Sequence, residues 1–232
     1  MFLTIPEFIS QETLAKIREI LDKSKFIDGR ITADKGADKN NLEMSPDEQY
    51  VEVAKIVDLA VRASEDVRYG IFPRYMSRPI VSRYEPGMSF AEHTDAAIMG
   101  LTTVPGRTLA PFGQGFVRTD FSMTLYLSDA DSYDGGELQL VIDGEPRRFR
   151  MPAGGAVIYE TGLRHQVLPV TRGVRLAAIV WMQTMVRNGD HRRLLRDAYR
   201  LASRLKSDAP QSMEAQQAND LFHNLLRTFA VV

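Results

Sequence analysis

The sequence contains no cysteine, and this absence removes several kinds of chemistry. Without thiols the chain cannot form a disulfide, ligate an iron–sulfur cluster or use a cysteine nucleophile. A chain without cysteine also fits a reducing compartment. The first residues, Met1 to Glu7, lack the basic start and the long apolar stretch of a secretory signal peptide. We therefore expect a cytoplasmic protein.

Long apolar runs and an excess of one charge are also missing. No window approaches the roughly 18 apolar residues of a membrane-spanning helix. The formal net charge is −1, so there is no basic field that would favour nucleic acid, and there is no polybasic run that would favour a membrane surface. We therefore expect neither partner. The chain of 232 residues, 44% hydrophobic and 25% charged, is typical of a globular protein whose core can hold a buried site.

Residues 1–78 form the first of three zones and are predicted to be mostly helical. Ser10 precedes an apolar series at helical spacing, and Ser45 before Pro46 marks a second helix start. The polar segment 28–41 between these helices is expected to be a loop.

Residues 79–187 form the second zone, which is rich in β-branched and aromatic residues and punctuated by glycine. Many short strands with regular turns predict a sandwich or barrel, and a jelly roll is the natural candidate. The segment 98–119 carries four glycines and two prolines, and a loop of this length is often a lid. The predicted strands are 79–84, 121–127, 137–142, 156–160, 166–170 and 174–182.

Residues 188–232 form the third zone and return to helix. Asp190 can cap one helix and Ser212 a second, with a break at 208–210. The sequence therefore predicts an α+β fold with a mainly β core, consisting of a domain over 1–187 and a helical appendage over 188–232.

Histidine is scarce, with four in the chain, and two of them carry the main chemical signal. His93 and Asp95 form an H-x-D triplet after a predicted strand and a glycine turn. Residues two apart in extended chain point to the same face, so an imidazole and a carboxylate project side by side. His165 begins a later predicted strand. Two histidines and one carboxylate make the facial triad of iron(II) oxygenases, which leaves metal positions open for a 2-oxo acid and dioxygen.

The triplet alone is weak evidence, because roughly 0.3 such matches are expected by chance in this composition. Arg175 strengthens it, since it follows His165 by ten residues and a guanidinium can bind the far carboxylate of 2-oxoglutarate bidentately. Taken singly, each residue has an ordinary interpretation: His165 as a core histidine, Asp95 as a turn residue and Arg175 as half of a surface ion pair. We interpret His191 as solvated surface and His223 as packing or surface.

Three ordered stretches resemble a known family. They are Ser82–Gly87 with His93–Asp95, Thr124–Ser128 with Asp134–Leu138, and His165–Arg175. Together they resemble the prolyl-4-hydroxylase-like 2-oxoglutarate dioxygenases, and in particular the PKHD-type hydroxylases. Lys39–Asn41, Trp181–Arg187 and His223–Arg227 are also similar to that subgroup. The resemblance therefore covers most of the chain.

The resemblance implies a double-stranded β-helix, of the cupin-like jelly-roll type, with helices packed on it. It implies that His93, Asp95 and His165 are the iron(II) ligands and the catalytic residues. The implied reaction hydroxylates an unactivated C–H with 2-oxoglutarate and dioxygen, releases succinate and carbon dioxide, and draws on L-ascorbate as a helper. Because Asp95 is present, hydroxylation is favoured over halogenation, in which related enzymes replace the carboxylate.

The resemblance also assigns the co-substrate pocket. It implies that Arg175 holds the 2-oxoglutarate carboxylate, that Tyr126 assists it and that Tyr84 lines the pocket. Taken singly, both tyrosines are core aromatics. Many relatives outside the subgroup have Ser or Thr two residues after the arginine, whereas this chain has Ala177. We therefore expect the co-substrate to depend more on Tyr126.

The substrate and the assembly remain open at the level of sequence. A free amino acid, a small metabolite and a peptidyl residue fit equally. Arg83, Arg107 and Arg118 are expected near the mouth of the site, where they could attract a carboxylate, although each is an ordinary surface charge by default. The segment 39–41 is expected to reach the same rim. The apolar stripes of the last helices favour a homodimer. A non-catalytic cupin-like metal-binding or sensing protein is the main alternative, and a structural β-sandwich with coincidental histidines is a third.

Overall fold

The computed structural model describes residues 2–32, 37–100 and 116–232 of the chain. Contacts divide the chain into two compact units, residues 1–60 with 75–183 and residues 61–74 with 184–232. The helices are α1 (Gln11–Asp22), the short 3-10 helix η1 (Gly29–Thr32), α2 (Glu48–Ala63), α3 (Glu65–Gly70), α4 (Gly189–Asp208) and α5 (Met213–Phe229). The strands are β1 (Phe2–Ile5), β2 (Phe26–Asp28), β3 (Lys39–Asn40), β4 (Leu42–Met44), β5 (Pro73–Met76), β6 (Ile80–Tyr84), β7 (Ser89–His93), β8 (Ile98–Gly100), β9 (Phe116–Arg118), β10 (Phe121–Tyr126), β11 (Asp134–Gly135), β12 (Leu138–Ile142), β13 (Glu145–Phe149), β14 (Ala156–Glu160), β15 (His165–Val167), β16 (Val170–Arg172) and β17 (Arg175–Thr184).

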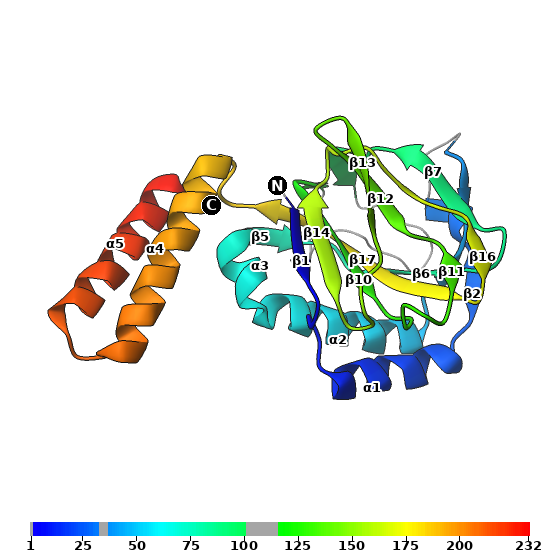
Figure 1. The fold of residues 1–232 in the computed structure, drawn as a ribbon, viewed down its shortest axis with the longest axis horizontal. Helices are drawn as coiled ribbons and strands as arrows, with labels where there is room; N and C mark the ends of the chain where they lie inside the picture. The colour runs from blue at the N-terminus through cyan, green and yellow to red at the C-terminus, as the bar shows by residue number, and fades with distance from the viewer. Residues whose placement is uncertain (1, 33–36, 101–115) are drawn as a thin grey trace. The chain divides into compact units, whose positions relative to one another are not determined.

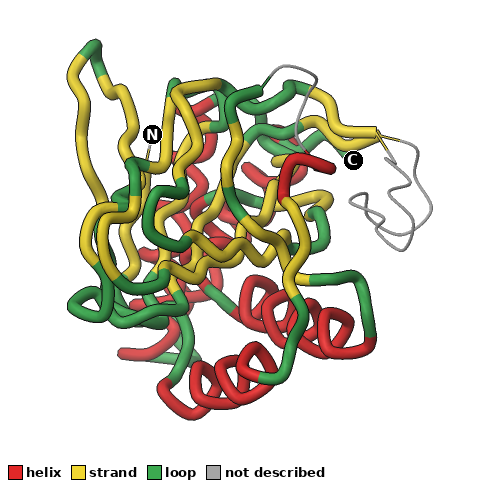
Figure 2. Tube along the Cα trace, turned by 90° about the vertical axis from the view of Figure 1, so that its right-hand side faces the viewer, coloured by secondary structure: helices red, strands yellow, loops and turns green. Residues whose placement is uncertain are grey.

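The first unit is built on two antiparallel sheets. The larger has the order β1-β14-β10-β17-β6-β4-β2, with β5 on β17, and the smaller has the order β13-β12-β15-β7-β3. Two short ribbons, β11-β16 and β8-β9, complete it. Figure 1 shows α1 and α2 along one side of these sheets, and Figure 2, turned by 90°, shows helices below the strands. The predicted jelly-roll core with helices packed on it is confirmed.

The core of this unit lies between the two sheets. Tyr126 and Val157 from the larger sheet pack with Leu138 and Leu140 from the smaller one. These residues alternate with outward-facing neighbours, because side chains in a strand point to opposite faces. The apolar cluster borders a cavity, because Leu138 and Tyr159 belong to both the cluster and the cavity wall.

The predicted strands of residues 79–187 lie close to strands of the structure, but the structure also has strands that were not predicted, namely β7, β8, β9, β11 and β13. The predicted strand 166–170 is divided into β15 and β16. The strand β13 was not predicted, because its sequence is polar, contains Pro146 and lies exposed at the edge of the smaller sheet.

The prediction of a mostly helical zone over 1–78 is wrong in part, because five short strands lie in it. Three of them cover the segment between α1 and α2, part of which was expected to be a loop. Within that segment β3 pairs with β7, and Lys39 lies opposite Phe90. A two-residue strand carries no periodicity of its own, so pairing with a neighbouring strand decides its conformation.

Helix starts were predicted with mixed success. Ser10 and Ser212 cap α1 and α5 through their side chains, as predicted. The start of α2 differs from the prediction, because the amide of Tyr50 donates to the carboxylate of Asp47 rather than to Ser45. The cap of α4 is Asn188, which accepts from two backbone amides, and not Asp190. Each correction moves the cap by two residues and keeps the helix.

The second unit has its own apolar cluster. Phe72, Val186, Leu195 and Phe222 are buried in it, and Tyr69 stacks on Tyr199 at 3.4 Å. Helices α4 and α5 form a hairpin, visible in Figure 1. Among the described residues, no helix is both long enough and apolar enough to span a bilayer.

The predicted lid covers residues 98–119, and only its two ends can be compared with the structure. They form the paired strands β8 and β9, with Met99 opposite Val117. The intervening segment 101–115, which includes Arg107, lies outside the described residues.

Candidate metal and co-substrate site

Strand pairing brings the two predicted metal histidines together. His93 ends β7, His165 begins β15, and the two residues are direct partners in the antiparallel ladder. Residues in such a pair have Cβ atoms about 5 Å apart. The two imidazole rings lie with their centroids 4.3 Å apart. The register of the smaller sheet therefore places the two histidines side by side, although they lie far apart in the sequence.

Backbone carbonyls set the proton position on both rings. The Nδ1 atom of His93 lies 2.8 Å from the carbonyl oxygen of Ala91, and Nδ1 of His165 lies 2.9 Å from that of Leu163. A carbonyl only accepts, so each Nδ1 carries the proton and donates it. The Nε2 atom of each neutral ring then carries a free lone pair, which a metal ligand needs.

Asp95 completes the cluster two residues after His93. Its Oδ1 lies 3.5 Å from Nε2 of His93 and its Oδ2 lies 3.7 Å from Nε2 of His165. One ligand atom from each of the three residues can be chosen so that all lie within 4.8 Å of one another. The described residues thus contain the two-histidine, one-carboxylate donor set that suits iron(II).

Electrostatics keep this cluster in its ligating form. Burial alone would raise the pKa of Asp95, but its polar surroundings, which include the hydrogen bond from the indole of Trp181, outweigh burial and leave the pKa below its ordinary value. Burial lowers the pKa of His165, which favours the neutral ring. A carboxylate beside neutral imidazoles is the protonation state that binds a divalent cation.

Two residues that the sequence did not single out hold Asp95 in place. The indole Nε1 of Trp181 donates to Oδ2 of Asp95 at 2.8 Å, and the hydroxyl of Ser122 donates to the same oxygen at 3.0 Å. Strand period could have found both. Trp181 lies six residues from Arg175 on β17, and Ser122 lies four from Tyr126 on β10, so each shares a face with a predicted site residue.

A cavity of about 270 Å³ extends from this cluster into the first unit. Its wall includes the three cluster residues, Arg175 and Tyr84. The volume is close to the lower end of the range for small-molecule sites. The cavity therefore joins the metal cluster to the predicted co-substrate arginine.

Arg175 is buried, with 1% of its surface exposed, and its guanidinium forms no ion pair within residues 2–32, 37–100 and 116–232. Its guanidinium carbon lies 5.2 Å from the centroid of the Tyr84 ring and 5.4 Å from that of Tyr126. Its Nε is buried without a hydrogen-bond partner among the described residues. A buried unpaired donor costs free energy, and a carboxylate at this end of the cavity would satisfy it. The residues present therefore fit 2-oxoglutarate.

Tyr84 stands beside the guanidinium as a neutral phenol. Burial raises its pKa to about 12, and the charge of Arg175 acts in the opposite direction. Tyr84 lies directly opposite Arg175 in the ladder between β6 and β17. Its hydroxyl therefore remains a hydrogen-bond donor at any physiological pH.

Tyr126 is placed differently from what its predicted role suggests. Its ring packs beside the guanidinium, but its hydroxyl donates to the carbonyl of Phe149 at 3.0 Å, and it is not part of the cavity wall. Burial raises the pKa of Tyr126. Beside Ala177, which is small, Ser82 lies in register on β6 and lines the cavity. Ser82 thus offers a hydroxyl near the position where Ala177 has none.

Of the other predicted residues that the structure describes, Lys39 lines the cavity, whereas Arg83, Arg118, His191 and His223 are not part of its wall. Arg83 pairs with Glu85 and lies over the ring of Phe26, and Arg118 pairs with Asp120. His191 is partly buried and stacks on Phe229 with centroids 3.9 Å apart, so it is not simply solvated surface. His223 is exposed.

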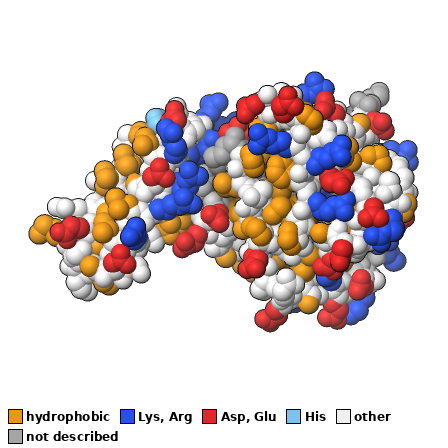
Figure 3. Space-filling view, viewed as in Figure 1, with side chains coloured by type: hydrophobic (Ala, Val, Ile, Leu, Met, Phe, Trp, Pro, Cys, Tyr) orange, Lys and Arg blue, Asp and Glu red, His pale blue; other side chains and the backbone are white. Residues whose placement is uncertain are grey.

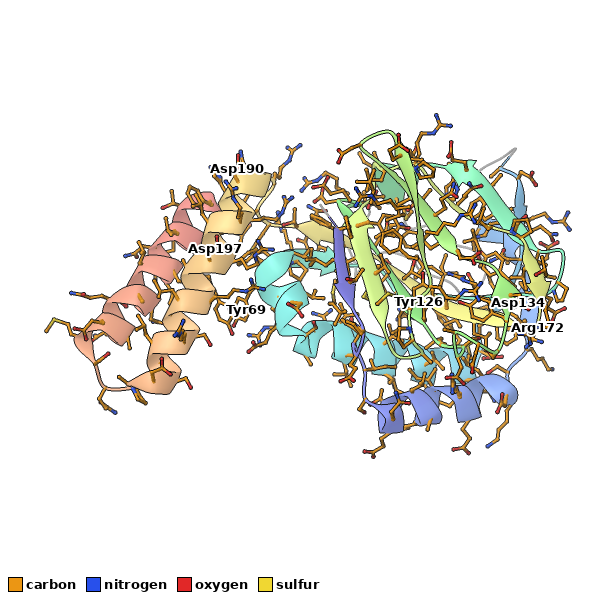
Figure 4. The ribbon with its side chains drawn as sticks, in the orientation of Figure 1. Tyr69, Tyr126, Asp134, Arg172, Asp190 and Asp197 are labelled. Carbon is orange, nitrogen blue, oxygen red and sulfur yellow. The ribbon has the colours of Figure 1, made fainter. Side chains whose placement is uncertain are left out.

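Charges on the visible surface are mixed. In Figure 3, lysine and arginine side chains are interspersed with aspartate and glutamate over the face shown. Figure 4 shows one such pair, Arg172 and Asp134, on the adjacent strands β16 and β11. Tyr126, in contrast, lies among the strands of the first unit in the same view.

Comparison with known proteins agrees with this geometry. Residues 79–183 match the sequence profile of the 2OG-Fe(II) oxygenase superfamily. A PKHD-type hydroxylase of Xanthomonas campestris is 37% identical over 235 residues, with both chains covered completely. A prolyl-4-hydroxylase structure from Pseudomonas putida has a TM-score of 0.54 and 19% identity, covering 78% of this chain and 92% of that one. HygX from Streptomyces hygroscopicus, solved with nickel, 2-oxoglutarate and hygromycin B bound, has a TM-score of 0.54 and 15% identity over 79% and 82% of the two chains.

Proposed function

Because the chain belongs to the PKHD-type hydroxylases of the 2OG-Fe(II) oxygenase superfamily, we propose that His93, Asp95 and His165 hold its iron(II) and that Arg175 holds its 2-oxoglutarate. The protein is an iron(II)- and 2-oxoglutarate-dependent dioxygenase that hydroxylates a substrate. Iron and co-substrate together supply the oxidation of a substrate C–H to C–OH. One oxygen atom of dioxygen enters the substrate and the other enters succinate, which forms from 2-oxoglutarate with loss of carbon dioxide.

The protein residues contribute position and protonation state. The carbonyls of Ala91 and Leu163 keep the two Nε2 atoms free, and Trp181 and Ser122 occupy Oδ2 of Asp95, which leaves Oδ1 for the metal. Such outer hydrogen bonds orient metal ligands and tune their basicity. No proton has to leave Asp95 before metal binds.

The far carboxylate of 2-oxoglutarate is assigned to Arg175, whose guanidinium lies close to the rings of Tyr84 and Tyr126. The observation that carries this assignment is the buried guanidinium with an unpaired Nε at the wall of the same cavity as the three metal residues. A buried cation without an anion is costly, and the co-substrate supplies the anion.

The main alternative for the site is a metal-binding or sensing cupin that performs no reaction. Such a protein has no need for a buried arginine in the metal cavity. The arginine and the full-length relative both favour the enzyme.

Succinate release tests the proposal. The protein is loaded with iron(II) without oxygen, and succinate is measured after oxygen and 2-oxoglutarate are admitted. Arg175→Ala should lose most turnover at low 2-oxoglutarate while it still binds metal. An exposed arginine on the same unit, Arg148→Ala, is the matched control and should behave as the native protein. Equal turnover in Arg175→Ala and the native protein would rule out the assignment.

The substrate and the assembly are proposals at a finer level. The cavity admits a free amino acid, a small metabolite or a peptidyl side chain. L-ascorbate is proposed as the reductant that keeps the iron reduced. A homodimer is proposed from the exposed leucines of the second unit, Leu194, Leu201 and Leu221, which are each about half exposed.

A further inference from the structure

Three polar residues at alternate positions point into the first unit. Lys39, Asn41 and Glu43 are buried, with exposed fractions of 8%, 2% and 0%, whereas Asn40 between them is exposed. In an ordinary half-buried strand the inward positions are apolar. A local conflict of this kind is expected at functional sites, where stability gives way to binding or catalysis.

The ammonium of Lys39 is held by two fixed partners. Its Nζ donates to Oε1 of Glu43 at 2.6 Å and to the hydroxyl of Thr32 at 2.8 Å. The Thr32 hydroxyl in turn lies 2.6 Å from Glu43. An ammonium has three N–H groups, so the third is left without a partner among the described residues. Lys39 and Thr32 line the cavity, whereas Glu43 lies behind them.

Lys39 is also close to the metal cluster. Its Nζ lies 5.4 Å from the centroid of the Phe90 ring, and that ring stacks on His93 with centroids 3.8 Å apart. The three side chains form a continuous wall on the smaller sheet, since β3 pairs with β7. Arg175 belongs to the larger sheet. The cavity therefore has two cations on two different walls.

The far carboxylate of 2-oxoglutarate pairs with only one of these two cations. With Arg175 assigned to 2-oxoglutarate, Glu43 is the one anion that pairs with the ammonium of Lys39 among the described residues. A buried ion pair is seldom better for stability than apolar residues of the same volume, so stability alone gives no reason for it at a cavity wall. We propose that Lys39 anchors the substrate by binding a substrate carboxylate, an inference that rests on the proposed function. Glu43 and Thr32 fix the ammonium so that its third N–H faces that carboxylate.

A carboxylate is the group that this arrangement binds best. A hydrogen bond from an ammonium to a carboxylate is about twice as strong as one between neutral groups, and the enclosed cavity weakens competition from water. A neutral amide of the same shape would keep the geometry and lose the charge. The affinities of a carboxylate and of its amide can therefore be compared directly.

Binding of paired ligands tests this inference without turnover. The protein is loaded with zinc and saturated with 2-oxoglutarate, and four carboxylates are titrated beside their amides: acetate, benzoate, phenylacetate and N-acetyl-L-alaninate. Trp181 is the only tryptophan and lies on the cavity wall, so its fluorescence reports binding. We expect at least one carboxylate to bind about tenfold more tightly than its amide.

Lys39→Met should reduce that preference to less than about twofold while affinity for zinc and 2-oxoglutarate remains. Lys55→Met removes an exposed lysine of α2 and is the matched control, which should keep the native preference. Because Lys39→Met leaves Glu43 buried without its cation, the double variant Lys39→Met with Glu43→Gln provides a second test should the single variant fail to fold. The double variant should show the same loss of preference.

Three results would overturn the inference. The first is that no carboxylate of the panel binds the native protein better than its amide. The second is that the preference survives in the lysine variants. The third is that those variants no longer bind 2-oxoglutarate, which would assign Lys39 to the co-substrate. If the native protein with zinc does not bind 2-oxoglutarate, both this inference and the proposed function fail. Binding of 2-oxoglutarate without any carboxylate preference defeats this inference alone.

Discussion

At the scale of single residues, the two oxygens of Asp95 have different surroundings. Oδ2 accepts hydrogen bonds from Trp181 and Ser122, whereas Oδ1 faces His93. A carboxylate with one oxygen already occupied offers the other to the metal. Trp181 therefore acts on the metal through Asp95 and not by touching it.

Replacing Trp181 by Phe tests this role. The ring packing is largely kept and the donor to Oδ2 is lost, so the affinity for nickel(II) should fall by about 10- to 100-fold. Isothermal calorimetry measures it directly. Trp181→Phe with native metal affinity would contradict the role, and Ser122→Ala should give a smaller loss in the same direction.

The metal residues could be predicted from sequence because their chemistry is rare and local. His93 and Asp95 are two apart, and histidine is scarce enough that His165 was the natural third member. The segment 39–41 was expected near the mouth of the site, but the burial of Lys39 could not be predicted in this way. Nothing in the segment 28–41 shows that Lys39 is buried, because its burial results from pairing of β3 with a distant strand.

At the scale of elements, the turn before β12 controls the position of Arg175. Gly136 has φ of +67°, and a Cβ added to it would lie 2.8 Å from Cγ2 of Val170 and 3.1 Å from Cδ of Arg175. Only glycine combines this backbone conformation with so little space. The glycine therefore leaves room for the stem of the arginine.

Gly136→Ala should raise the KM for 2-oxoglutarate and lower stability by about 1–3 kcal/mol, because the new methyl group displaces Arg175. Gly144→Ala is the matched control. Gly144 also has a positive φ, of +82°, but no atom lies within 4 Å of its added Cβ. Its variant should cost about 1 kcal/mol of backbone strain and leave the KM unchanged. Equal KM values in both variants would contradict the spatial argument.

Elements with strong alternation were predictable, and short edge elements were not. The strands β6, β10, β12, β14 and β17 are apolar and lie near their predicted ranges. The hairpin from β12 to β13 had a usable signal that was missed, since Asp143 and Gly144 both have positive φ and form an Asp-Gly turn. The hairpin was not predicted, because the polar sequence of β13 is not typical of a strand.

At the scale of the whole molecule, truncation can test the predicted domain boundary. The sequence predicts a domain over 1–187 and an appendage over 188–232. The apolar cluster of the second unit contains Phe72 and Val186 as well as Leu195 and Phe222. Cutting the chain at 187 would expose two side chains that are now 3% and 0% exposed.

A chain ending at residue 187 should therefore aggregate or melt at a lower temperature than the full chain, because the exposed apolar surface is no longer covered. Light scattering and a thermal melt measure this. Ser212→Ala, which removes only a helix cap, is a mild comparison and should cost about 1 kcal/mol. A truncated chain that stays monomeric with the native melting temperature would show that the appendage is dispensable.

The most direct test of the central claim is metal-dependent binding of 2-oxoglutarate, measured by calorimetry with nickel(II) in place of iron(II). The native protein should bind one 2-oxoglutarate with nickel and bind it far more weakly without metal, because one end of the co-substrate needs the metal and the other needs Arg175. His165→Ala should lose the dependence on nickel, and Arg175→Ala should lose 2-oxoglutarate while keeping nickel. Binding that is equally tight with and without metal, or unchanged in Arg175→Ala, would contradict the account.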